Sequence, residues 1–214
     1  MRRPPARALR LLLGAVGLFV VGVALSGGPQ AVGVRLAGAG LLAQAAWLAR
    51  YDVARRTIRT PGATRYMAAA LIAGYVWLAI AGGVWLASGS LSGGGFGYDA
   101  MVHAIFLGFV FSMVFAHAPV IVPAVLGVPL PYRRTFYAPL VLLHVGLTMR
   151  VLGDAAGAAT AWRWGGVLNE VAIVGFLVVA VHAAVRGRAT SRARAAGRPA
   201  RPRPNRAREG LRVP

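Results

Sequence analysis

The sequence contains no cysteine and no lysine, and it has few acidic residues. Without cysteine the chain has no disulfide, no thiolate metal site and no iron–sulfur cluster, so any metal or cofactor must be held by histidine, methionine, carboxylate or backbone groups. All 24 basic residues are arginine, against five acids, which gives a formal net charge of +19. The sequence also lacks a Gly-x-Ser-x-Gly nucleophile elbow and a lysine-containing phosphate loop, which argues against a hydrolase or nucleotide-binding enzyme.

Charged residues are missing from long stretches of the chain, which is 57% hydrophobic. The apolar residues form runs of about 20, the length that a helix needs to cross a bilayer. We therefore predict an all-α polytopic membrane helix bundle over residues 1–185. Its six transmembrane helices are expected at about residues 11–26, 31–49, 66–88, 99–121, 135–152 and 164–185. The first helix also has features of a signal peptide, with small residues at Ser26-Gly27-Gly28 for cleavage, and a cleaved chain would keep five helices.

Arginine is distributed unequally between the two sides of the predicted bundle. One side, made of residues 1–10, 50–65, 133–134 and 186–214, holds every arginine except Arg35, Arg150 and Arg163. By the positive-inside rule this side is cytoplasmic and carries both termini, as in a multi-pass protein of the bacterial inner membrane.

The last segment, residues 186–214, is rich in Arg, Ala, Pro and Gly and cannot bury a core. We predict that it is a disordered cytoplasmic tail that contacts anionic lipid. Nucleic acid binding is not expected, because no aromatic residues are interleaved for base stacking.

All four histidines lie in predicted spans. His103 and His117 are fourteen residues apart on one helix, which in an α-helix places both imidazoles on one face about 21 Å apart. An imidazole in hydrocarbon is costly unless it finds a partner, so each histidine is a candidate functional residue. Their depths predict an outer layer of His103 and His144 with Glu170 nearby, and an inner layer of His117 and His182.

Two layers of paired histidines suit ligation of b-type haem iron, and this is our leading hypothesis. Gly108 would make room for the macrocycle, and Arg150, with Arg35 and Arg163, would bind the propionates of the outer haem. Copper or non-haem iron is less expected, because either needs three or more converging ligands. The alternative is that the histidines make helix-to-helix hydrogen bonds. The chain would then be a small transporter or assembly factor in which histidines and Glu170 form proton or substrate sites.

The segment from Tyr98 to Asp154 carries a resemblance to known families. It contains His-Ala-Ile-Phe-Leu-Gly-Phe-Val-Phe-Ser-Met-Val-Phe from His103, then Pro119 and Pro123, then Leu143-His144 and Arg150-Val-Leu-Gly-Asp154. This run resembles the NnrS-type haem–copper membrane proteins and, more distantly, haem–copper oxidase subunit I. The resemblance implies a haem ligand at His103 and a role in electron transfer, haem handling, or respiration linked to nitric oxide or oxygen. The chain lacks the paired His-His of a reducing centre, so we expect an incomplete enzyme at most, working with a membrane redox partner or a second copy.

Overall fold

The computed structural model describes residues 5–90 and 96–196, which form helices and turns without a strand. Six of its helical stretches are long and apolar enough to cross a membrane, as predicted. They span Ala6–Leu25, Gln30–Tyr51, Ala63–Ser88, Tyr98–Leu126, Arg134–Ala155 and Ala159–Ala189. Most of the predicted outer loop at residues 89–97, and residues 197–214 of the predicted tail, lie outside the described residues.

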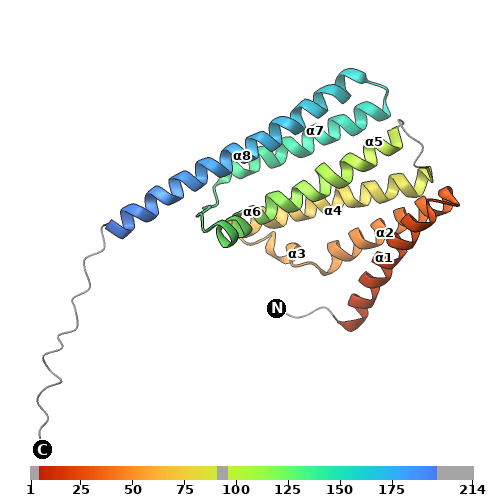
Figure 1. The fold of residues 1–214 in the computed structure, drawn as a ribbon, viewed down its shortest axis with the longest axis horizontal. Coiled ribbons are helices and arrows are strands. Elements are labelled where there is room, and N and C mark those ends of the chain that lie inside the picture. The colour runs from red at the N-terminus through yellow and green to blue at the C-terminus, as the bar shows by residue number, and fades with distance from the viewer. Residues whose placement is uncertain (1–4, 91–95, 197–214) are drawn as a thin grey trace, which may run out of the picture.

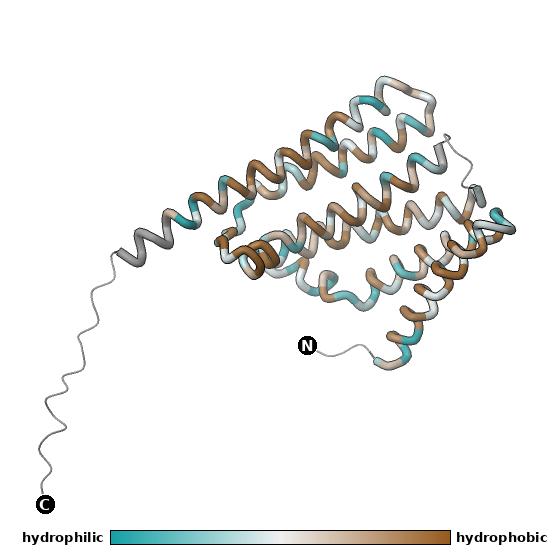
Figure 2. Tube along the Cα trace, in the orientation of Figure 1, coloured by the Kyte–Doolittle hydropathy of each residue, from teal (hydrophilic) through white to brown (hydrophobic). Residues whose placement is uncertain are grey.

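The long helices stand side by side in an order that follows the chain (Figure 1). The elements are α1 (Ala6–Leu25), α2 (Gln30–Tyr51), the short α3 (Ala54–Thr57), α4 (Ala63–Ser88), α5 (Phe96–His103), the π-helix η1 (Ala104–Val110), α6 (Phe111–Leu126), the 3-10 turn η2 (Arg134–Phe136), α7 (Tyr137–Ala155) and α8 (Ala159–Ala196). Elements α5, η1 and α6 form one continuous rod between α4 and α7. Figure 2 shows hydrophobic residues along the middle of the long helices and hydrophilic residues gathered near their ends.

Glycine allows neighbouring helices to approach closely. A Cβ added at Gly22 would overlap the backbone of Ala37, which joins α1 to α2. One added at Gly82 would lie 2.8 Å from the carbonyl oxygen of Gly38, which joins α4 to α2. Because lipid tails are as apolar as the side chains, helices in a bilayer associate mainly through such close packing. A third close approach is at Gly74 on α4, where an added Cβ would lie 2.8 Å from Cε of Met113, whereas a Cβ at Gly83 would meet nothing within 4 Å.

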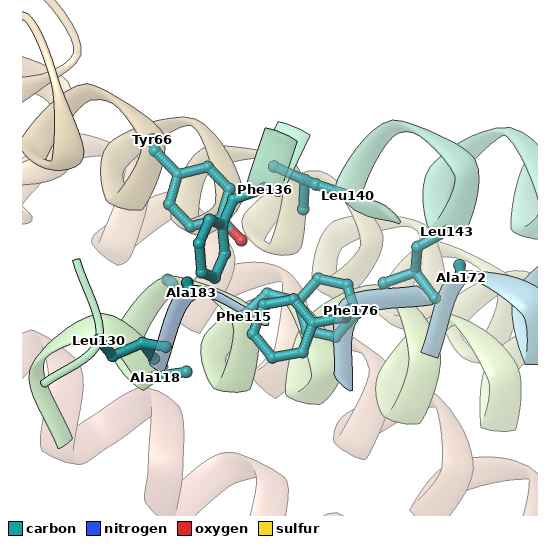
Figure 3. Packing of buried hydrophobic residues seen from close by; sticks show 12 residues of the cluster. Tyr66, Phe115, Ala118, Leu130, Phe136, Leu140, Leu143, Ala172, Phe176 and Ala183 are labelled. Carbon is teal, nitrogen blue, oxygen red and sulfur yellow. The ribbon is translucent and has the colours of Figure 1, made fainter. Parts of the chain in front are cut away.

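An aromatic cluster ties α4, α6 and α8 together (Figure 3). The rings of Phe115 on α6 and Phe176 on α8 are stacked, with centroids 3.9 Å apart. Tyr66 on α4 meets Phe136 edge to face at a centroid distance of 5.8 Å. Such aromatic pairs stabilise a fold beyond the contribution of the area that they bury. This cluster therefore stabilises the packing of α4, α6 and α8 against one another.

The rod from α5 to α6 differs from the predicted single α-helix. Residues 104–110 are π-helical, and α6 runs through Pro119 and Pro123 to Leu126, beyond the predicted end of the span at about residue 121. Proline is tolerated in membrane helices because neighbouring groups satisfy the backbone that it leaves free. The rod ends instead at Gly127, whose φ of 62° is a left-handed cap conformation.

The last helix is longer than the sequence indicated. Helix α8 continues past Val185 to Ala196, so the prediction of disorder from residue 186 is wrong for residues 186–196. The physical reason is that the Arg and Ala residues of this stretch have high helix propensity and extend an existing helix without a new nucleus.

Candidate functional site

A cavity of about 520 Å³ lies between α4 and α7. Its lining is apolar apart from the side chains of Trp77, His144 and Thr148. Val76 and Leu152 also line it and are 55% and 62% exposed, so the cavity opens sideways onto the apolar surface of the bundle. A molecule dissolved in lipid would therefore have direct access to it.

A hydrogen bond across this cavity fixes the state of His144. The indole Nε1 of Trp77 donates to Nδ1 of His144 at 2.9 Å. An indole N–H can only donate, so Nδ1 is the acceptor and the proton of the neutral imidazole is on Nε2. That Nε2 is buried and has no hydrogen-bond partner within the described part of the chain. A buried donor left unpaired costs about 1–3 kcal/mol. His144, a lining residue of the cavity, thus carries one buried N–H that lacks an acceptor within the described part of the chain.

The third polar group of the cavity is already used as a donor. The hydroxyl of Thr148 donates to the backbone carbonyl of His144, one turn earlier on α7, at 2.8 Å. Its oxygen keeps lone pairs that can accept. A ligand in the cavity would therefore meet one donor, at His144, and one acceptor, at Thr148.

The π-helix positions Trp77. Gly108 lies in η1, and a Cβ there would overlap Cβ and Cγ of Trp77, so the backbone of η1 presses directly on the indole. The hydroxyl of Ser112 donates to the carbonyl of Gly108 at 2.5 Å and closes this turn. Short π-helical turns occur frequently at functional sites. Gly108, which we had expected to make room for haem, makes room for Trp77.

A second polar cluster joins α5, α7 and α8. The carboxylate of Asp99 accepts hydrogen bonds from Arg150 at 2.9 and 3.2 Å and from Nε1 of Trp162 at 3.3 Å. The guanidinium of Arg150 also lies 4.6 Å from the centroid of the Trp162 ring. Arg150 thus has a protein partner, and its contacts give no support to a role in binding haem propionates.

His103 and His117 are in the opposite tautomer from His144. Nδ1 of His103 lies 2.8 Å from the carbonyl oxygen of Asp99, and Nδ1 of His117 lies 2.8 Å from that of Met113. Because each Nδ1 donates to a carbonyl, Nε2 keeps its lone pair. This is the arrangement that metal-binding histidines use.

The π-helix changes the geometry expected for these two histidines. The prediction that they share one face assumed an α-helix throughout, but η1 lies between them. Hydrogen bonds in a π-helix run from i to i+5, so its turn takes one extra residue and rotates the residues after it by about 100°. His103 lies on the side of the rod that carries Asp99, and His117 lies between the exposed Val114 and Ile121.

The structure does not bring His103 and His144 together. His144 precedes Arg150 by six residues on α7, which is about 600° and leaves the two side chains about 120° apart around the helix. Arg150 points at Asp99, in the turn before His103, whereas His144 points at Trp77 on α4. The two histidines of the predicted outer pair therefore make their hydrogen bonds to different partners, His103 to Asp99 and His144 to Trp77.

The remaining candidates lie at the periphery. His182 and Glu170 are exposed on α8, and neither lines the cavity between α4 and α7. Arg163 is exposed, and Arg35 lies against the end of α4, where a Cβ on Gly89 would come within 2.9 Å of its guanidinium carbon. The predicted inner layer of His117 and His182 has no contact that supports it.

Sequence reasoning missed Trp77, Thr148 and Trp162 as site residues. The sequence did contain an indication of these residues, because an indole N–H in a membrane span needs a hydrogen-bond partner just as an imidazole does. The partners are far apart in sequence, however: Trp77 and His144 are separated by 67 residues.

Within residues 5–90 and 96–196, no three His, Asp or Glu side chains are grouped so as to hold a metal ion. Residues 1–185 match the family model described as a domain of unknown function, DUF8744. No curated protein sequence and no solved structure matches the chain.

Proposed function

The chain belongs to the DUF8744 family, and we propose that it is a membrane protein that binds a lipid-soluble ligand bearing a carbonyl acceptor in the cavity between α4 and α7. One observation carries this proposal: the buried Nε2–H of His144 has no acceptor in the described structure, and His144 lines that cavity. A ligand carbonyl would satisfy it.

The rest of the cavity supports the same class of ligand. Its volume of about 520 Å³ lies in the range of small-molecule sites, and such sites combine apolar walls with a few placed polar groups. An alkyl benzoquinone has this character, since it is a flat apolar ring with carbonyl oxygens. This function corresponds to the transporter or assembly-factor hypothesis, with His144 as the substrate-binding residue.

The test is binding of a short-chain alkyl benzoquinone to the purified protein in detergent, measured by calorimetric titration. His144→Leu removes the donor and should weaken binding about tenfold, the equivalent of one hydrogen bond to a buried group. His182→Leu, at an exposed position on α8, is the matched control and should bind as the wild type does. An alkylbenzene without carbonyls should bind with equal affinity to the wild type and to His144→Leu. Equal quinone affinity in the wild type and His144→Leu would overturn the proposal.

A second candidate function is b-type haem binding, which the tautomers of His103 and His117 favour. Each keeps Nε2 free while Nδ1 is held by a carbonyl, so each fits an iron ligand. His144 does not fit, because Trp77 occupies its Nδ1 and its Nε2 carries the proton. When bound, haem would supply one-electron redox chemistry.

This candidate is tested by colour. Protein from haem-supplied cells should show a Soret band and a b-type pyridine haemochrome spectrum. His103→Ala and His117→Ala should each remove part of the Soret absorbance, and His144→Ala should remove none. A colourless wild-type protein would reject haem binding and leave the quinone-site proposal standing.

We also propose that the protein lies in the bacterial inner membrane with both termini cytoplasmic. Six apolar helices are compatible with a multi-pass protein, and the arginine asymmetry of the sequence supports this orientation.

A further inference from the structure

A second apolar groove lies between α4 and α2, next to the His144 cavity, and Val76 lines both. Its volume is about 510 Å³. Alanines at 45, 46 and 49 line the α2 side, and Ile72 faces them from α4. Alanine side chains are too short to fill the space between the two helices, so an open channel remains along them. This groove belongs neither to the His144 cavity nor to the Asp99 cluster.

One end of the groove carries positive charge. Helix α3 closes this end, and Arg55 of α3 is a lining residue. Arg56 and Arg59 are exposed in the same short segment. The nearest acid in sequence, Asp52, accepts the backbone N–H of Ala54 at 2.7 Å and a hydrogen bond from Tyr75, which also lines the groove. The groove is therefore apolar along most of its length, and at this end the three arginines Arg55, Arg56 and Arg59 outnumber the one carboxylate, Asp52.

This distribution matches an amphiphile with a negative headgroup. Helix α3 joins the ends of the α2 and α4 spans, so Arg55 lies where headgroups of one leaflet would be, on the side that carries most of the arginines. Basic pockets at such positions bind anionic lipid headgroups, and a guanidinium can pair with a phosphate through two hydrogen bonds.

We propose that the groove is a specific site for an anionic phospholipid, with one acyl chain between α2 and α4 and the headgroup phosphate at Arg55. The inference goes beyond the quinone site, because it concerns a different groove and a structural lipid of the membrane. It also differs from general attraction of the basic tail to the membrane, because it requires a shaped groove as well as charge.

The experiment compares phosphatidylglycerol with phosphatidylcholine, each supplied to the full-length protein in detergent micelles. Lipid retained per protein after purification is counted by native mass spectrometry. Arg55→Gln removes the headgroup contact, and Ala46→Phe fills the groove from an exposed position without changing charge. Arg59→Gln is the matched control, because Arg59 is exposed in the same segment and does not line the groove.

We expect the wild type and Arg59→Gln to retain phosphatidylglycerol in preference to phosphatidylcholine, and Arg55→Gln and Ala46→Phe each to retain at least fivefold less. Equal losses in Arg55→Gln and Arg59→Gln, with no effect of Ala46→Phe, would show charge attraction without a site and overturn the proposal. Unchanged retention in all three variants would also overturn it. The melting temperature of each variant in detergent without added lipid identifies a variant that has lost its fold. If Ala46→Phe does not fold, Ala46→Leu replaces it.

Discussion

The indole N–H of Trp77 lies 2.9 Å from Nδ1 of His144, inside the apolar part of the bundle. This one contact decides what His144 can do. It places the imidazole proton on Nε2, a buried atom with no hydrogen-bond partner among the described residues, and His144 lines the cavity between α4 and α7. Had Nδ1 donated to a carbonyl, as it does in His103 and His117, Nε2 of His144 would have kept its lone pair.

Trp77→Phe should allow His144 to adopt both neutral tautomers. Phenylalanine keeps an aromatic ring in the packed position but has no N–H, so we expect a loss of about 1 kcal/mol in the free energy of unfolding. In nitrogen NMR of labelled histidine, the assigned signals of His144 should show Nε2 protonated in the wild type and both tautomers in the variant. Trp164→Phe, at an exposed ring, is the control and should alter neither measurement. Protonation of Nδ1 of His144 in the wild type would contradict the hydrogen bond from Trp77.

Gly108→Ala should destabilise the bundle. The added Cβ would overlap the Trp77 side chain, and overpacking of this kind costs about 1–3 kcal/mol. The matched control is Gly175→Ala on α8, where an added Cβ meets nothing within 4 Å and stability should change by less than about 0.5 kcal/mol. Unfolding in a denaturing detergent series measures both variants. Equal stability of the two would mean that η1 does not press on Trp77.

Asp99 and Arg150 should be energetically coupled. Their hydrogen bonds are charge-assisted and partly buried, so a double-mutant cycle with Asp99→Asn and Arg150→Gln should give a coupling of about 1.5–3 kcal/mol. The same cycle with Arg163→Gln in place of Arg150→Gln should give none, because Arg163 is exposed. Additive effects of the Asp99 and Arg150 changes would contradict the pairing as a stabilising contact.

Reporter fusions should confirm the orientation. A reporter placed after Pro214 should read as cytoplasmic, and one inserted in residues 89–97 should read as external, because arginine-rich segments stay inside. Alkaline phosphatase and green fluorescent protein give opposite signals and serve as controls for each other. The reverse pattern would overturn both the orientation and the leaflet assigned to the lipid site.

The six helices and the positions of the histidines within them could be read from the sequence. Spans are predictable because their signal is local: a run of apolar residues long enough to cross a bilayer must be helical to satisfy its own backbone. The boundaries were less predictable, since α6 continues past Pro119 and Pro123 and α8 continues to Ala196. Neighbouring helices satisfy the backbone groups that a proline leaves free, and an existing helix extends without the cost of a new nucleus. Neither effect can be predicted from the local sequence.

The sequence by itself therefore determined the all-helical class, the six apolar spans and His144 as a polar residue in one of them. Only the tertiary structure decided that His144 meets Trp77, that Arg150 meets Asp99, and that His103 and His144 make their hydrogen bonds to different partners. The physical reason is that each residue along an α-helix is rotated by about 100° from the one before it, so the face on which a side chain lies depends on its exact position. One π-helical turn, stabilised by the contact between Gly108 and Trp77, is enough to redirect every later side chain of the rod.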